Sequence, residues 1–187
     1  MANRNTQGFG LVPAGTLGQT PATSGTGKYK IDAGYTTTIY HGGAVASNAG
    51  YIIDGQTTDA PILGVLNGIF YNAATTLKPT FANFYKQPIT PANSEDIDAF
   101  VFDNPQQQYV VATDAAVAQS GYLETYDMNA SAGSTTTGKS SSTLDIGDTS
   151  ADAAAFRLLR SAEDPENDEN AAFRSVVVCL NLIELQS

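Results

Sequence analysis

The stretch Ile62-Leu-Gly-Val-Leu-Asn-Gly-Ile-Phe-Tyr71 is the strongest strand signal in the chain. β-branched and aromatic side chains dominate it, and this composition is typical of β-structure. Its internal glycines, Gly64 and Gly68, predict a bulge or a sharp bend of the kind that small barrels use. The segment Lys78–Tyr85 is expected to return beside it as the partner strand.

On both sides of this stretch, short runs of similar composition recur, separated by turn residues. The expected strands are 29–31, 36–40, 45–47, 50–53, 121–126, 155–160 and a closing strand, buried on both faces, over Val176–Leu180. A second strand pair, 97–103 with 107–112, is expected to turn at Asn104-Pro105. Residues 151–159 also have a helix-like composition, but a strand at 155–160 is preferred. We therefore predict an all-β fold, a barrel or sandwich of about 8 to 10 strands, with residues 28–187 as a single domain.

Residues 1–27 are rich in Gly, Pro and Thr and lack both helical and strand periodicity. They are expected to form an extended, irregular arm. Its large apolar side chains would fill pockets on a neighbouring protein: Phe9, Leu11, Val12 and Leu17. Residues 1–30 carry three basic side chains, Arg4, Lys28 and Lys30, and no acidic one, whereas the whole chain has a net charge of −10. This bias favours contact with an acidic protein surface, and a solvated tail is the alternative.

The composition argues against several classes of protein. A net charge of −10 disfavours direct binding to nucleic acid. No apolar run approaches the roughly 20 residues of a membrane span, and the N-terminus does not resemble a signal peptide. Cys179 is the one cysteine, so no internal disulfide is expected, and production in a reducing cytoplasm is predicted.

Residues Gly133-Ser-Thr-Thr-Thr-Gly138-Lys139-Ser140 match the phosphate-loop pattern letter for letter. That loop needs a buried strand before it and a helix after it, because the helix N-terminus directs N–H groups at the anion. Neither element is expected here. We therefore predict a polar turn without nucleotide.

The sequence offers little equipment for catalysis or metal binding. His41 is the one histidine, and with a single cysteine it cannot complete a zinc site. No G-x-S-x-G elbow is present. The acidic clusters at 95–98, 145–148 and 164–168 lack calcium-loop spacing, although calcium binding there and a glycosidase carboxylate pair remain open. No enzymatic activity and no cofactor are expected.

Several motifs together resemble the capsid decoration, or cement, proteins of tailed bacteriophages, in particular those of marine podophages. The resemblance is carried by five motifs along the chain, three of which consist of two neighbouring segments. They are Gly8–Gly15, Ile62–Tyr71 followed by Lys78–Tyr85, Ala99–Pro105 with Gln108–Val111, Thr137–Ser140 with Leu144-Asp145, and Val176–Leu185. The segments at 131–142 and 163–170 are long for a minimal protein of this kind.

The resemblance implies a β-barrel body that binds the outer surface of the phage head, with the major capsid protein as partner. Contacts to other copies of itself stay open. The expected action is passive, a clamp across capsomer seams that buries about 1,000 to 2,000 Å². The capsid-binding residues would be those of the arm and its basic border: Arg4, Phe9, Leu11, Val12, Leu17, Lys28 and Lys30. Two alternatives stay open, a host-surface or carbohydrate-binding virion module with tyrosine-rich loops, and a nucleotide hydrolase that uses Lys139.

Overall fold

Antiparallel strands form the framework of the chain, and a computed structural model describes residues 3, 5–18, 25–56, 61–147, 154–168, 170–181 and 183–186. Within these ranges there are thirteen strands and no α-helix. Three short 3-10 turns complete the secondary structure: η1 (Ala92–Ser94), η2 (Gln119–Gly121) and η3 (Glu184–Gln186). The predicted all-β class is confirmed.

The first sheet has five strands in the order β1-β8-β13-β12-β9. They are β1 (Val12–Thr16), β8 (Gln107–Ala112), β13 (Ser175–Leu180), β12 (Phe156–Ser161) and β9 (Thr125–Tyr126). The closing strand β13 is central and buried at every position, as expected. A small ribbon of β10 (Met128–Asn129) and β11 (Thr143–Leu144) accompanies this sheet.

The second sheet has six strands in the order β2-β7-β5-β3-β4, with β6 paired to β5. They are β2 (Gly27–Ile31), β7 (Ile97–Phe102), β5 (Gly64–Asn72), β3 (Ala44–Asn48), β4 (Tyr51–Asp54) and β6 (Pro79–Ala82). The predicted return strand is confirmed, because β6 pairs with β5 from Ile69↔Ala82 to Asn72↔Pro79.

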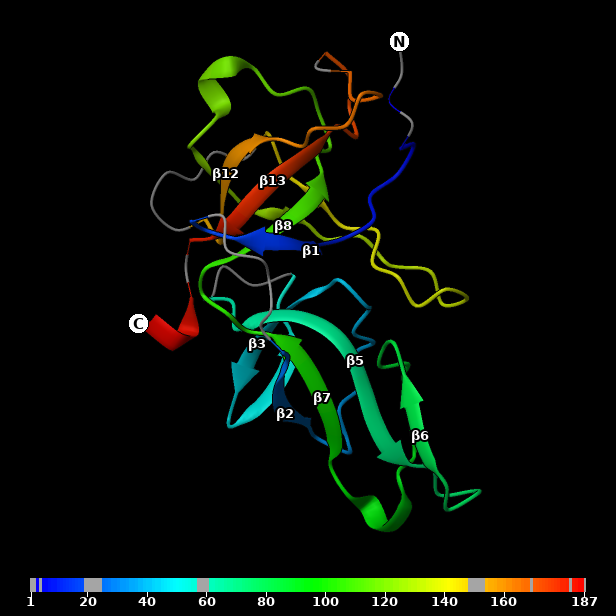
Figure 1. Ribbon diagram of the computed structural model, residues 1–187. Coiled ribbons are helices and arrows are strands. Elements are labelled where there is room, and N and C mark those ends of the chain that lie inside the picture. The colour runs from blue at the N-terminus through cyan, green and yellow to red at the C-terminus, as the bar shows by residue number, and fades with distance from the viewer. Residues whose placement is uncertain are drawn as a thin grey trace.

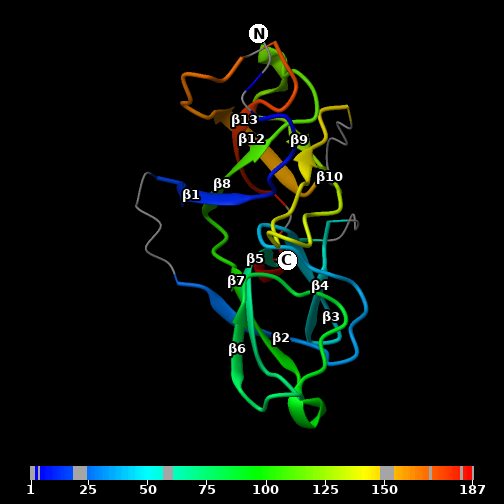
Figure 2. The same cartoon turned by 90° about the vertical axis from the view of Figure 1, so that its right-hand side faces the viewer.

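The two sheets form two lobes along the long axis of the molecule (Figures 1 and 2). We call the lobe of β1 and β8–β13 the first lobe and the lobe of β2–β7 the second lobe. Each has its own hydrophobic core, but the core of the first lobe also contains Ala44, Ile62 and Val65 from the other half. The next residue along β5, Leu66, belongs to the second core. Strand β5 therefore joins the two cores.

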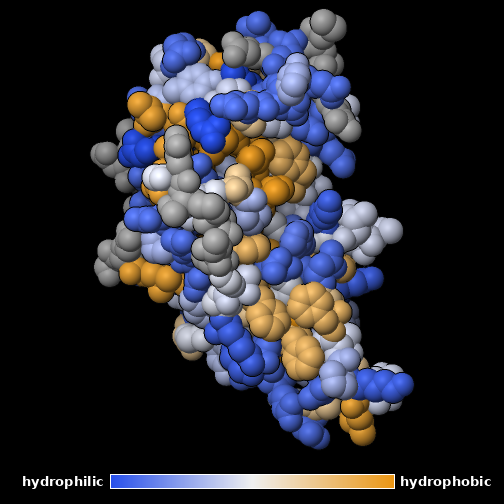
Figure 3. All heavy atoms as spheres, in the orientation of Figure 1, coloured by the Kyte–Doolittle hydropathy of each residue, from blue (hydrophilic) through white to orange (hydrophobic). Residues whose placement is uncertain are grey.

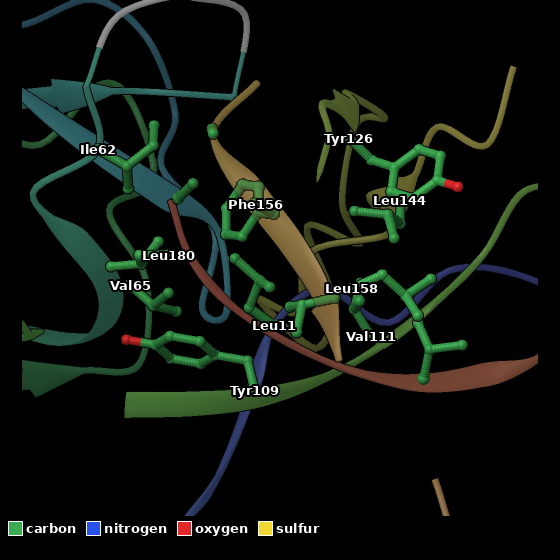
Figure 4. Packing of buried hydrophobic residues seen from close by; sticks show 14 of the residues in the cluster. Leu11, Ile62, Val65, Tyr109, Val111, Tyr126, Leu144, Phe156, Leu158 and Leu180 are labelled. Carbon is green, nitrogen blue, oxygen red and sulfur yellow. The ribbon is translucent and has the colours of Figure 1, made fainter. Parts of the chain in front are cut away.

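Figure 4 shows the core of the first lobe, where side chains from β8, β12 and β13 converge with Leu11 from the N-terminal segment. Tyr109, Val111, Phe156 and Leu158 are all inaccessible to solvent there. Removal of this much apolar surface from water is the main stabilising contribution that such a core makes.

The bend predicted for β5 is present. The register between β5 and β7 shifts between Leu66 and Gly68, which identifies a β-bulge at Asn67. Gly64 lies against the neighbouring strand, and a Cβ at that position would clash with the Phe102 carbonyl oxygen. The glycines thus let the strand curve around its core.

Two expectations about the strands are wrong, and of the two predicted architectures the barrel is not formed by the described strands. Strands 97–102 and 107–112 exist but do not pair, because the turn after Phe102 carries the chain from the second sheet into the first. Residues 36–40 form no strand and contribute one isolated bridge, Ile39↔Tyr85. No closed barrel forms among the described strands: β4 lies near β2, but the two are not joined by a ladder.

Candidate functional site

The N-terminal segment, expected to be an irregular arm, is partly a strand. Val12–Thr16 form β1, which pairs with β8 at the edge of the first sheet. Further upstream, the Asn3 side-chain amide donates hydrogen bonds to the backbone carbonyls of Asp168, Ala171 and Ala172, the shortest at 2.9 Å to Ala172. The segment is therefore attached along the body, and the expected boundary at residue 27 does not mark its separation from the domain. Arg4 lies outside the described residues.

Leu11 cannot act as an anchor in a partner's pocket in this fold, because it is 1% exposed and lies in the first core. Its N–H donates to the Gly42 carbonyl oxygen at 2.8 Å. The preceding Gly10 has φ 72°, and a Cβ there would lie 2.7 Å from the same oxygen. Glycine permits both the left-handed backbone and the close approach that places Leu11 in the core. Phe9 is half-buried.

Val12 and Leu17 remain available to a partner, with exposed fractions of 47% and 40%. Val12 is opposite Val110 on β8, which is opposite Val177 on β13. These three valines form a cross-strand row on the face of the sheet away from the core, because the alternate residues of β8 and β13 point into the core. We call Val12, Val110 and Leu17 the apolar strip.

Lys28 and Lys30 do not extend a basic arm. They lie on β2 in the second lobe, where their ammonium groups approach Asp98 on β7 at 2.7 and 2.6 Å. Burial alone would raise the pKa of Asp98, but the two lysine hydrogen bonds outweigh it and hold that pKa below its ordinary value. The structure thus gives both lysines a partner within the chain.

Sequence reasoning missed an aromatic cluster on the outer face of the second sheet. Phe81 on β6 is 64% exposed, and its ring centroid is 6.0 Å from that of Phe100 on β7. Phe70 on β5 is the cross-strand partner of both Phe81 and Asp98, so its side chain shares their face. Figure 3 shows apolar surface over the outer faces of both lobes on the same side of the molecule. The alternation in β7 was visible in the sequence, but which face was outer depended on strand pairing.

A pocket of about 280 Å³ adjoins this cluster at the end of the second lobe. Its lining residues Pro91 and Glu95 flank η1, and the ribbon views place η1 at the far end of the second lobe (Figures 1 and 2). Polar and aromatic groups from β2, β5 and β7 and from the flanking loops line it: Lys30, Phe70, Asn72, Glu95, Asp96 and Asp98. Asp96 is oriented by a hydrogen bond from the Tyr51 hydroxyl at 3.1 Å.

The segment that matches the phosphate-loop pattern joins β10 to β11, so a strand, not a helix, is the next described element after it. Ser140 and Ser142 are buried and both donate to the Gln56 side-chain oxygen, from Ser140 at 3.1 Å. Lys139 is exposed and bridges to His41 through the backbone. The strand–loop–helix context on which phosphate binding depends is therefore missing.

His41 and Cys179 are the remaining candidates for catalysis or metal binding, and both contact structural elements of the fold. His41 Nδ1 lies 2.8 Å from the Asn67 carbonyl oxygen, beside the β5 bulge. Burial raises the pKa of the Cys179 thiol. In the described part of the chain, no three His, Cys, Asp or Glu side chains converge as metal ligands, and none of the helical turns there is long enough to cross a bilayer.

No protein family, curated protein or solved structure matches the chain significantly.

Proposed function

We propose that this chain is a structural virion protein that decorates the outer surface of a phage head, where it binds the major capsid protein across capsomer seams and stabilises the shell. The single observation that carries the proposal is the apolar strip at the edge of the first sheet, where Val12 on β1 and Leu17 just after it are exposed at 47% and 40%. An apolar, uncharged edge on an otherwise acidic chain is typical of a protein-binding surface.

The strip is suited to contact through side chains rather than to the addition of another strand. Pro13 has no N–H to donate, and the register with β8 shifts between Pro13 and Gly15. Proline and bulges are the means by which edge strands avoid unwanted pairing. A partner would therefore pack onto Val12, Leu17 and the adjacent Val110.

The elongated arrangement of the two lobes supports a clamp across a seam. One lobe presents the apolar strip, and the other presents the Phe70, Phe81 and Phe100 cluster. Figure 3 shows apolar surface over both lobes in one view. A contact of about 1,000 Å² or more is needed for specific binding. A chain that fixes its contact residues on paired strands loses little conformational entropy when it binds.

Co-sedimentation with phage heads from which this chain has been removed tests the proposal. The wild-type chain is expected to pellet with the heads, and the double variant Val12→Asp, Leu17→Asp to bind at least about tenfold more weakly, because buried unpaired carboxylates are costly. Leu77→Asp is the matched control, since Leu77 is 73% exposed on the turn that joins β5 to β6. It should bind as wild type does.

Failure of the wild-type chain to pellet would contradict the proposed function. Wild-type binding that the double variant retains would instead remove the apolar strip from the contact. Circular dichroism of both variants establishes that they are folded.

A further inference from the structure

We infer that the pocket at the end of the second lobe binds a neutral sugar residue of a glycan. The pocket shares Phe70 with the aromatic cluster assigned to the clamp, but its other lining residues, such as Asn72 and Glu95, lie outside that cluster.

The size and position of the pocket fit a single sugar ring. Its volume is about 280 Å³, slightly below the roughly 300 to 1,000 Å³ of sites for larger small molecules. The site is formed mainly by ladder positions: Phe70 is opposite Asp98, which is opposite Lys30. Groups fixed on paired strands are held more accurately than groups on loops.

The chemistry of the lining matches the two surfaces of a sugar. The Phe70 ring offers an apolar wall against which the C–H face of a pyranose packs. Asn72 lies two residues further along the same face of β5 and supplies an amide that both donates and accepts. Glu95 and Asp96 supply acceptors and Lys30 a donor, which together serve hydroxyl groups that need both.

Several of these polar groups are already oriented. Lys30 is fixed on Asp98 at 2.6 Å, and the Tyr51 hydroxyl holds Asp96 at 3.1 Å. A prepositioned site requires less ordering when its ligand binds. Glu95 is exposed and Asn72 is half-buried at the pocket, so both are placed to receive a ligand.

The charge selects a neutral ligand over an acidic one. Glu95, Asp96 and Asp98 outnumber Lys30 in the lining, and the whole chain carries −10. Sialylated or phosphorylated glycans would be repelled by this field.

Two-dimensional NMR of the full chain, titrated with sugars, tests the inference. The neutral probes are the methyl glycosides of glucose, galactose, mannose and N-acetylglucosamine, with N-acetylneuraminic acid and glucosamine as the anionic and cationic probes. At least one neutral glycoside is expected to shift amide resonances at Phe70, Asn72 and Asp98 with a Kd on the order of 1 mM, the affinity that a ligand of this size supports.

Asn72→Ala and Glu95→Gln should each weaken that binding about tenfold, because each removes hydrogen bonds from the ligand. The matched controls, Asn170→Ala and Glu163→Gln, change exposed side chains of the first lobe and should leave Kd within about twofold of wild type. The spectra themselves report whether each variant is folded.

The inference is wrong if no neutral probe shifts the pocket resonances at about 50 mM, far above the expected Kd. It is equally wrong if a charged probe alone binds, or if neutral binding is unchanged in both pocket variants.

Discussion

Leu11 and Val12 are neighbours in the chain with opposite environments. Leu11 is 1% exposed in the first core, whereas Val12 is 47% exposed on the outer face of β1. Alternation of side chains along an extended segment accounts for the contrast, since successive residues point to opposite faces. Two residues that the sequence grouped as equivalent anchors therefore have separate roles, one in stability and one in contact with a partner.

Leu11→Ala is expected to lower the free energy of unfolding by about 2 to 5 kcal/mol, because it leaves a cavity in a packed core. Val12→Ala should change it by less than about 0.5 kcal/mol. Urea denaturation followed by circular dichroism measures both. Equal losses for the two variants would contradict the assignment of Leu11 to the core.

Tyr29 makes stability depend on pH in the alkaline range. Burial, followed by the hydrogen bond that its hydroxyl donates to Asp103 at 2.7 Å, raises the pKa of Tyr29 to about 12. The folded state retains the proton at a pH where the unfolded chain has lost it. The stabilisation is therefore complete below the ordinary value of 10.0 and is lost as pH rises through about 12.

Tyr29→Phe should consequently lose less stability than wild type between about pH 9 and pH 11. The measurement is the urea midpoint at each pH, compared between the two proteins. Other buried tyrosines, such as Tyr109, whose pKa burial also raises, leave part of the alkaline loss in place. An identical pH dependence in both proteins would show that Tyr29 is not linked to folding.

At the scale of elements, β1 covers the edge of β8, and the first sheet ends with it. Its Pro13 and its bulge make that edge a poor template for further pairing. Strand β8, by contrast, has a regular ladder of backbone groups that β1 normally occupies. The N-terminal segment therefore has a structural task in addition to the contact proposed for its outer face.

Deletion of residues 2–16 is expected to lower the melting temperature and to cause self-association, because it removes Leu11 from the core and exposes the edge of β8. Light scattering after size exclusion measures the association. The Val12→Asp, Leu17→Asp variant keeps β1 and should have the same mass in solution as the wild-type chain. A truncated chain that formed no larger assemblies than wild type and kept its melting temperature would contradict this account of β1.

At the scale of the molecule, the two lobes are coupled through β5. Val65 lies in the core of the first lobe and Leu66 in that of the second, while the Leu66 backbone exchanges hydrogen bonds with Gly42 and Gly43 at 2.9 and 3.0 Å. Strand β3 spans the cores in the same way, with Ala44 in the first and Val45 in the second, so a disturbance in one core reaches the other through both strands.

We accordingly expect one unfolding transition for the whole chain. Leu158→Ala in the first core and Ile69→Ala in the second should shift the same midpoint, by calorimetry and by tyrosine fluorescence alike. Two separable transitions, each sensitive to one substitution, would show that the lobes fold independently.

The proposed head-binding strip and the proposed sugar pocket lie in different lobes of the molecule. The strip lies on β1 in the first lobe, and the pocket lies beside η1 at the end of the second. The two tests above are independent, because each uses variants from the other lobe as controls.

The sequence by itself determined the local structure. The runs rich in β-branched and aromatic residues at 62–71 and 176–180 became β5 and β13, since these side chains pack well on a pleated surface. The strand preferred at 155–160 became β12. The glycines of β5 predicted its bend, and the missing helix after Lys139 ruled out a phosphate-loop context. These are properties of short segments, and short segments carry their own signals.

Tertiary structure alone decided which strands pair and which faces are covered. The turn at Asn104-Pro105 looked like a hairpin, yet it carries the chain between sheets, because the pairing partners of β7 and β8 lie far away in the sequence. The sequence suggested that Lys28 and Lys30 form a basic border available to a partner, but in the fold both form ion pairs with Asp98 on β7. Cross-strand neighbours come from long-range register, which no local pattern encodes, and both the apolar strip and the sugar pocket consist of such neighbours.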